Sequence, residues 1–380
     1  MTTLENLAAA VLLFGLVMYA AFAGADFGGG IWTALASGPR AREQRENLFH
    51  AIGPVWETNH IWLIFVVVTL FTAFPKGFAA LFIALLVPLV VALVGINFRG
   101  AAFAFRHFGR RTVSGVPLIA RAFEVSSILT PFALGIAVTA TATGRIAVVN
   151  GQARAEPWSW VTPFTLVGGL VGMAVCAYLA PIYMTVRTRR ELQLDFRKRG
   201  MIAGFVLGVL TAVEIPVALA DAPLFANRLL TTRAVLFVAL AVVSGATTLV
   251  LLWRRRYLGA QIAAAGTVAL TITGFCAAMY PDLLIGQLTL AAAAAPPATL
   301  VAFFAVLPVG VLLLAPSLLF LYWTFRGEPN PELPPEDPRS KPTSPISGTR
   351  FPTNKEDHHG KTDSGRISCR YTDVHFQGRP

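Results

Sequence analysis

The sequence predicts an all-α, polytopic membrane protein, and three observations lead to this fold class. Hydrophobic residues make up 55% of the 380 residues and charged residues only 13%, about half the charged share of a typical soluble protein. The mean hydropathy is +0.62. Apolar stretches of about twenty residues recur along the chain, and a helix of that length crosses a hydrocarbon core of ~30 Å.

Nine stretches are expected to cross the membrane as helices. Their approximate limits are residues 7–35, 54–74, 77–97, 122–142, 161–186, 201–220, 234–253, 259–279 and 299–324. The first is too long for a signal peptide and follows no basic leader. The second and third are joined tightly at Pro75, Lys76 and Gly77.

Lysine and arginine in the loops set the expected orientation. The loops after the first, third, fifth and seventh spans carry seventeen of these residues, against five in the loops on the other side. Because basic loops stay in the cytoplasm, we expect the N-terminus outside and the C-terminus in the cytoplasm. The net charge of +11 is then a signal of topology, and no nucleic-acid partner is needed to explain it.

Composition divides the chain into two parts. Residues 1–326 form the predicted transmembrane helical domain, and residues 327–380 are polar, rich in proline and without apolar periodicity. A segment of this kind cannot bury a core, so we expect a disordered cytoplasmic tail.

The cysteines Cys176, Cys276 and Cys369 have no metal-ligand spacing and predict no disulfide framework.

The first span combines an acid with small residues. Ala20, Gly24 and Gly28 recur every four residues and form a smooth face for close packing against another helix. Asp26 points away from that face by helix geometry. Gly28 begins a run of three consecutive glycines, which predicts either a close approach to the backbone or a break in the helix.

Three ionisable residues are expected in the cytoplasmic third of the bilayer. Asp26 lies in the inner half of the first span, Glu57 opens the second span from the cytoplasmic side, and Arg99 ends the third. Ionisable groups within a membrane are costly and often functional. Two interpretations stay open: an ion pair that only fixes the helices, and a proton entry path through partly desolvated carboxyl groups.

Two further polar residues lie near the same edge. His60 follows Glu57 by three residues and shares its helix face. Glu124 begins the fourth span beside Arg121, where it can reach the cytoplasm along its own side chain or belong to the site. On its own, Glu57 also fits a helix-end residue at the headgroups.

Glu214 is the acid that the sequence places deepest in the later spans. It lies two residues before Pro216, where a helix kink frees backbone groups. Two environments stay open for it: a wet cavity, or an ion pair with Arg228 or Arg233 near the outer surface.

The histidines argue against a cofactor held by this chain. His50, His60 and His107 fall near the cytoplasmic edge, and the other three lie in the tail. Integral haem proteins need histidine or similar axial ligands within their spans. The segment GADFGGG also lacks the Lys-Ser/Thr pair of a P-loop. We therefore expect no cofactor bound by this chain and any redox cofactor to come from another chain.

Several sequence blocks, in order, carry a resemblance to a known family. GADFGGGIW is similar to Asp-Gly-Phe-Asp-x-Gly-x-Gly, and AIGPVWETNHIWLI to Pro-x-Trp-Asp-Gly-Asn-x-x-Trp-Leu. LFTAFP and INFRGAAFAFR are similar to Leu-Phe-x-Ala-x-Pro and Phe-Arg-x-x-x-Phe-x-x-Arg, while YMTVRTRRELQLDFR and YWTFRG match later pieces. With these motifs the chain resembles subunit II of the cytochrome bd-type quinol oxidases over about residues 7 to 327.

The resemblance implies a non-haem subunit of a two-subunit quinol:oxygen oxidoreductase in the bacterial cytoplasmic membrane. The expected partner is subunit I, which binds haem b and haem d, oxidises quinol and reduces dioxygen to water. Membrane lipid and a small accessory subunit are further expected partners. Subunit II would stabilise subunit I and supply a cytoplasmic proton path.

The resemblance also implies roles for particular residues. Glu57 stands at the family's Trp-Asp aspartate, Asp26 at the second aspartate of the first-helix motif, and Arg99 at the Phe-Arg arginine. Glu57 would admit protons, Asp26 would pass them on, and Arg99 would tune the proton affinity of both. Trp56 and Asn59 would orient Glu57.

Two departures from the family pattern and a rival function accompany this interpretation. The family's first aspartate is Ala23 here, and its aspartate and glycine after the tryptophan are Glu57 and Thr58. The rival is a proton-coupled secondary transporter that uses Asp26 and Glu57. An odd number of spans without a visible repeat counts against it. A purely structural partner is the third interpretation.

Overall fold

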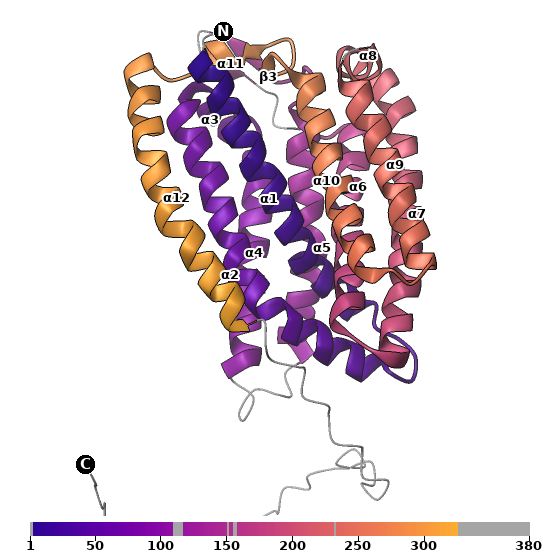
Figure 1. Ribbon diagram of the computed structural model, residues 1–380. Coiled ribbons are helices and arrows are strands. Elements are labelled where there is room, and N and C mark those ends of the chain that lie inside the picture. Colours follow the sequence, from indigo (N-terminus) through magenta and orange to yellow (C-terminus); the bar gives the residue numbers. More distant parts are fainter. Residues whose placement is uncertain (1–2, 109–116, 150–151, 155–157, 232, 326–380) are drawn as a thin grey trace, which may run out of the picture. The chain divides into compact units, whose positions relative to one another are not determined.

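The computed structural model describes residues 3–108, 117–149, 152–154, 158–231 and 233–325, and most of them form long helices that run side by side (Figure 1). The helices are α1 (Thr3–Ala34), α2 (Ala41–Ala73), α3 (Pro75–Ala84), α4 (Leu86–Phe108), α5 (Pro117–Ala140), α6 (Pro163–Arg187), α7 (Arg190–Asp221), α8 (Pro223–Thr231), α9 (Ala234–Trp253), α10 (Tyr257–Met279), α11 (Leu290–Ala293) and α12 (Pro297–Phe325). Two antiparallel hairpins lie in the connections: β1 (Ala147–Val149) with β2 (Gln152–Arg154), and β3 (Asp282–Leu284) with β4 (Leu288–Thr289).

The all-α, multi-span class is confirmed. Among the described residues, eight helices are long and apolar enough to cross a membrane, and a ninth span arises if the bent pair α2–α3 counts as one. The predicted tail lies outside the described residues, so its disorder stays a prediction.

The predicted third span, 77–97, is wrong in its limits. The helix stops at Ala84 and a new one starts at Leu86, because Pro88 has no backbone N–H and fits the first turn of a helix. A separate break lies between α2 and α3, which are bent by 118° relative to each other. At this break the carbonyl oxygen of Ala73 accepts a hydrogen bond from the N–H of Ala295 at 2.9 Å.

Two helices begin more than ten residues earlier than predicted. α2 starts at Ala41 rather than at residue 54, and α7 starts at Arg190 rather than at residue 201. The added turns are rich in Glu, Gln, Arg and Lys, which are good helix formers although they are too polar for hydrocarbon. Arginines assigned to loops, such as Arg42 and Arg197, therefore lie on helices.

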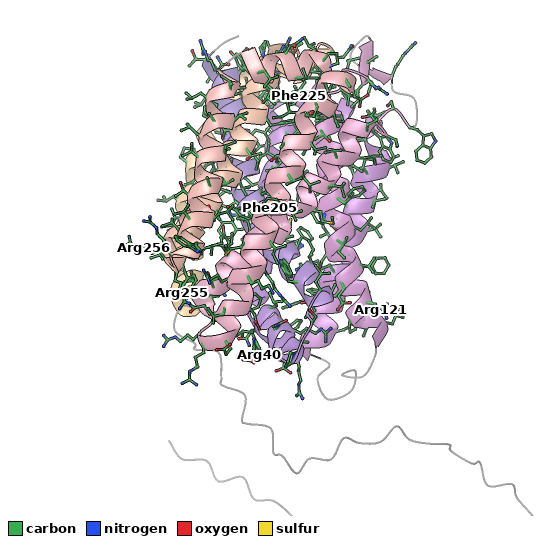
Figure 2. The ribbon with its side chains drawn as sticks, turned by 90° about the vertical axis from the view of Figure 1, so that its right-hand side faces the viewer. Arg40, Arg121, Phe205, Phe225, Arg255 and Arg256 are labelled. Carbon is green, nitrogen blue, oxygen red and sulfur yellow. The ribbon has the colours of Figure 1, made fainter. Side chains whose placement is uncertain are left out.

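Several arginines lie toward one end of the bundle. Figure 2 shows Arg40, Arg121, Arg255 and Arg256 toward the same end, with Phe225 near the other. Basic groups there also stabilise helix ends: the Arg197 guanidinium donates to the carbonyl oxygens of Leu252 at 2.7 Å and Trp253 at 3.0 Å, both in the last turn of α9.

α1 is the central helix of the site region and packs against α2, α5 and α6, while α12 lies at an edge beside α2 (Figure 1). The small face predicted on α1 meets α6. Gly24 lies against Leu179, and a Cβ added at Gly28 would overlap the carbonyl oxygen of Cys176. α1 stays helical to Ala34, so close packing and not a helix break explains the glycine run.

Gly28→Ala is expected to lower the free energy of unfolding by about 1–3 kcal/mol, because the added methyl group must push α1 away from α6. Gly208→Ala on α7 is the matched control, since nothing lies within 4 Å of its added Cβ; it should be neutral or stabilising by up to about 1 kcal/mol. Thermal unfolding of the purified protein in detergent measures both. Equal effects of the two substitutions would contradict the close packing.

Candidate functional site

A fully buried ion pair joins α1 to α4. The Asp26 side chain is 0% exposed and that of Arg99 is 2% exposed. Nη1 of Arg99 donates to Oδ2 of Asp26 at 2.8 Å, and Nη2 donates to Oδ1 at 2.6 Å and to the Asp26 carbonyl oxygen at 2.8 Å. This two-pronged geometry is the strong form of an arginine–carboxylate pair.

Side chains from two more helices complete the pair. Nδ2 of Asn59, on α2, donates to Oδ2 of Asp26 at 3.1 Å. Nε of Arg99 donates to Oγ of Ser127, on α5, at 3.0 Å. The rings of Phe27 and Phe123 each lie 4.9 Å from the guanidinium carbon, within cation–π range. Four helices therefore meet at one charged junction.

Local sequence explains how the junction fits. A Cβ added at Gly30 would overlap Oγ of Ser127, so glycine lets α5 bring this hydroxyl group beside α1. Ser127 in turn donates to the carbonyl oxygen of Phe123 at 2.7 Å, which leaves its oxygen turned to Arg99. The hydroxyl group thereby serves as an acceptor for the arginine.

The structure brings together three residues that the sequence singled out: Asp26, Arg99 and Asn59. Asn59 was predicted to orient Glu57, and its hydrogen bond in the structure goes to Asp26. Trp56 and Glu57 belong to α2, but their side chains lie outside the described part. Their predicted roles stay predictions.

The other candidates lie apart from this junction or at its edge. His60 is half-buried on α2 and lines a hollow beside it. Glu124 is half-buried on α5. Glu214 is half-buried on α7, and the described residues offer it no ion pair. Of the two arginines that the sequence offered as its partners, Arg228 donates from Nη1 to Oδ2 of Asp282 at 2.9 Å.

Sequence reasoning missed Ser127 and Tyr19. A sequence signal for Ser127 is the pair Ser126-Ser127 within an apolar span. Tyr19 lies seven residues before Asp26, so Tyr19 and Asp26 lie on the same side of α1. Neither residue type is ionisable at neutral pH, so a search for charged groups passes over them.

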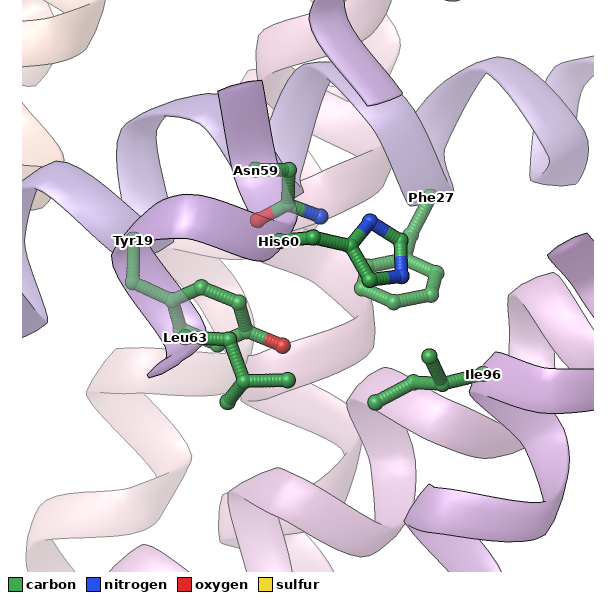
Figure 3. Close-up of a pocket in the computed structure, with 6 residues that line it drawn as sticks. All are labelled: Tyr19, Phe27, Asn59, His60, Leu63 and Ile96. Carbon is green, nitrogen blue, oxygen red and sulfur yellow. The ribbon is translucent and has the colours of Figure 1, made fainter. Parts of the chain in front are cut away.

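A narrow hollow lies beside the ion pair (Figure 3). It is lined by Tyr19, Phe27, Asn59, His60, Leu63 and Ile96 and holds about 160 Å³ of atom-free space, including its open side. The Tyr19 hydroxyl group and Oδ1 of Asn59 are buried there without a hydrogen-bond partner. A buried polar atom in this state costs about 1–3 kcal/mol.

No metal centre is found among the described residues, where no three His, Cys, Asp or Glu side chains cluster.

The comparison with known proteins gives a clear result: the family model described as "Cytochrome bd terminal oxidase subunit II" matches residues 4–325. The chain belongs to this family. The resemblance carried by the sequence motifs is thereby confirmed.

Relatives in the bd oxidase family cover parts of the chain. The "Cytochrome bd ubiquinol oxidase subunit 2" of Bacillus subtilis (strain 168) is 27% identical over 234 residues, 61% of this chain and 66% of that protein. The "Cytochrome bd-I ubiquinol oxidase subunit 2" of Escherichia coli (strain K12) is 27% identical over 200 residues, 52% of this chain and 51% of that protein. The matched regions span less than two thirds of either relative.

The structure of bd oxidase from Geobacillus thermodenitrificans contains a chain with the same fold. It superposes with a TM-score of 0.73 at 23% identity and covers 86% of this chain and all of that one. The apolar helices and the family together identify a multi-pass bacterial membrane protein.

Arg99→Met is expected to lower the free energy of unfolding by about 3–5 kcal/mol, because it leaves the Asp26 carboxylate buried without a counter-charge. The double variant Asp26→Leu with Arg99→Met should lose less than the single variant, since no charge is then stranded. Arg145→Met breaks the pair with Asp221, in which the arginine is 49% exposed, and should cost at most about 1 kcal/mol. A double variant as unstable as Arg99→Met would contradict this account of the ion pair.

Proposed function

We propose that the chain is the non-haem subunit of a cytochrome bd-type quinol:oxygen oxidoreductase. The observation that carries the proposal is the family match over residues 4–325. The names of the relatives, which are ubiquinol oxidase subunits, support quinol as the reductant. A heterodimer with subunit I in the cytoplasmic membrane, joined by lipid and a small accessory subunit, is part of the proposal.

The proposed orientation places the arginine-rich end of the bundle in the cytoplasm. Arg40, Arg121, Arg255 and Arg256 support it because they lie toward one end, as basic residues on the cytoplasmic side do. The N-terminus is then outside. In this orientation the Asp26–Arg99 pair lies in the cytoplasmic third of the membrane.

The proposed task of the chain is twofold: it stabilises subunit I and admits protons from the cytoplasm. Haem b and haem d in subunit I would supply electron transfer and oxygen reduction. Glu57 is the proposed entry carboxyl group and Asp26 the group that receives its proton. Trp56 and Asn59 are the proposed residues that orient Glu57, and His60, Glu124 and Glu214 are additional candidates.

The geometry of the ion pair suits a relay better than a proton store. Asp26 accepts three side-chain hydrogen bonds, two from Arg99 and one from Asn59. A proton bound to Asp26 would leave the buried Arg99 without its counter-charge. We therefore assign Asp26 the role of passing protons on.

Proton uptake from the cytoplasm would let the complex separate charge. Oxygen reduction consumes protons in subunit I, while quinol oxidation releases protons on the outside. Protons drawn inward through this chain then add to the difference across the membrane, and no pump is required. The family match favours this function over a secondary transporter.

Glu57→Gln is expected to slow oxygen consumption of the purified complex by about a hundredfold or more, because glutamine keeps the size of glutamate but cannot donate a proton. Haem content, measured by the reduced-minus-oxidised difference spectrum, should stay near normal.

The control for this variant is Glu46→Gln, which removes an acid from the same helix. Glu46 pairs with Arg42 one turn away at 3.0 Å and lies outside the junction. It should leave oxygen consumption unchanged. Unchanged turnover in Glu57→Gln would instead favour a purely structural role of the acids.

A further inference from the structure

The hollow beside the ion pair joins three helices and is lined mainly by apolar groups. Tyr19 and Phe27 come from α1, and Ile96 comes from α4. Asn59, His60 and Leu63 come from α2. Figure 3 shows Tyr19 directing its hydroxyl group into the space between the side chains of α2 and α4.

Asn59 connects the hollow to the charged junction. Its amide nitrogen donates to Asp26, while its amide oxygen has no partner and belongs to the lining of the hollow. Asn59 is 2% exposed. An acceptor on Asn59 and a donor on Tyr19 thus lie unsatisfied in the lining of one space.

The same face of α2 continues this polar line. Nε1 of Trp62 and Oγ1 of Thr69 are also buried without a hydrogen-bond partner. Asn59, Trp62 and Thr69 are spaced by three and seven residues, so they share one helix face. That face meets α1, where the ring of Trp62 packs edge-on against Phe14 at 5.6 Å. Unsatisfied polar atoms therefore follow the seam between α1 and α2.

The width of the hollow decides what it can hold. Its atom-free space of about 160 Å³ includes the open side, and in this packing no point of it is wide enough to seat a water molecule. Leu63 and Ile96, which form part of the wall, are aliphatic and can change rotamer. Water is the ligand that fits both a lone acceptor and a lone donor.

We propose that the hollow is a gated water site. When Leu63 and Ile96 turn aside, one water molecule donates a hydrogen bond to Oδ1 of Asn59 and accepts one from the Tyr19 hydroxyl group. In the proposed path Glu57 would give a proton to this water and Asp26 would receive one from it, so the molecule remains water. As a proton station the site rests on the proposed function, whereas its hydration does not.

Hydration is tested by radiolytic labelling of the intact complex in ¹⁸O-water, with mass spectrometry of the labelled residues. Short X-ray pulses generate hydroxyl radicals from bound water, so Tyr19 and Leu63 should be labelled. Tyr178 on α6 is the matched control, because it is a tyrosine that is 1% exposed and lies outside the hollow. Labelling of Tyr19 no greater than that of Tyr178 would overturn the proposal.

Two variants test the hollow from opposite sides. Tyr19→Phe removes the donor, and Ile96→Phe fills the space while both polar atoms stay. Each variant should lower the labelling of Leu63. Each should also slow oxygen consumption by about three- to tenfold, which corresponds to the free energy of one hydrogen bond. The ratio of the oxygen-consumption rates in H₂O and D₂O should change as well. Tyr178→Phe should alter none of these. Normal Leu63 labelling in Ile96→Phe would overturn the proposal.

The two proposals fail in different ways. If the labelling is as expected but Glu57→Gln and Tyr19→Phe both turn over normally, the water site stands and the proton path falls. If Glu57→Gln is slow but Tyr19 and Leu63 stay unlabelled, the proton path stands and the water site falls.

Discussion

The pairing of Asp26 with Arg99 is the constraint on which the rest of this region depends. A single charge removed from water costs several kcal/mol even after relaxation, and both side chains are almost completely buried. The cost is offset only when each polar atom has a partner. Asn59 and Ser127 supply those partners from α2 and α5, so the positions of four helices are tied to one pair of charges.

The meeting of Asp26 with Arg99 could be predicted in part from the sequence, because successive spans run in opposite directions. Direction together with helix rise predicts that both residues lie at the same level of the bundle, and their ion pair confirms it. Rotation about the helix axis is harder to obtain, since several faces of α5 are apolar enough to be buried. The side of α5 that carries Ser127 was therefore hard to predict.

Helix limits were harder to predict than helix identity, for a physical reason. Hydropathy marks where a helix can lie in lipid, whereas helix propensity decides where it ends. α2 and α7 extend beyond the apolar stretch because their polar ends favour helix, and α4 starts late because Pro88 requires a first-turn position. The bend of 118° after α2 falls at Phe74, directly before Pro75, which starts α3; a proline disfavours helical backbone at the residue before it, but it does not set the angle.

The bend after α2 has a consequence for the end of the chain. The carbonyl oxygen released at Ala73 receives the N–H of Ala295, two residues before α12 begins, and α12 itself buries little of its surface in this chain. A backbone hydrogen bond thus joins the entry of the last helix to the end of the second helix, more than 200 residues earlier in the chain. The position of α12 therefore depends on the angle at which the chain leaves α2.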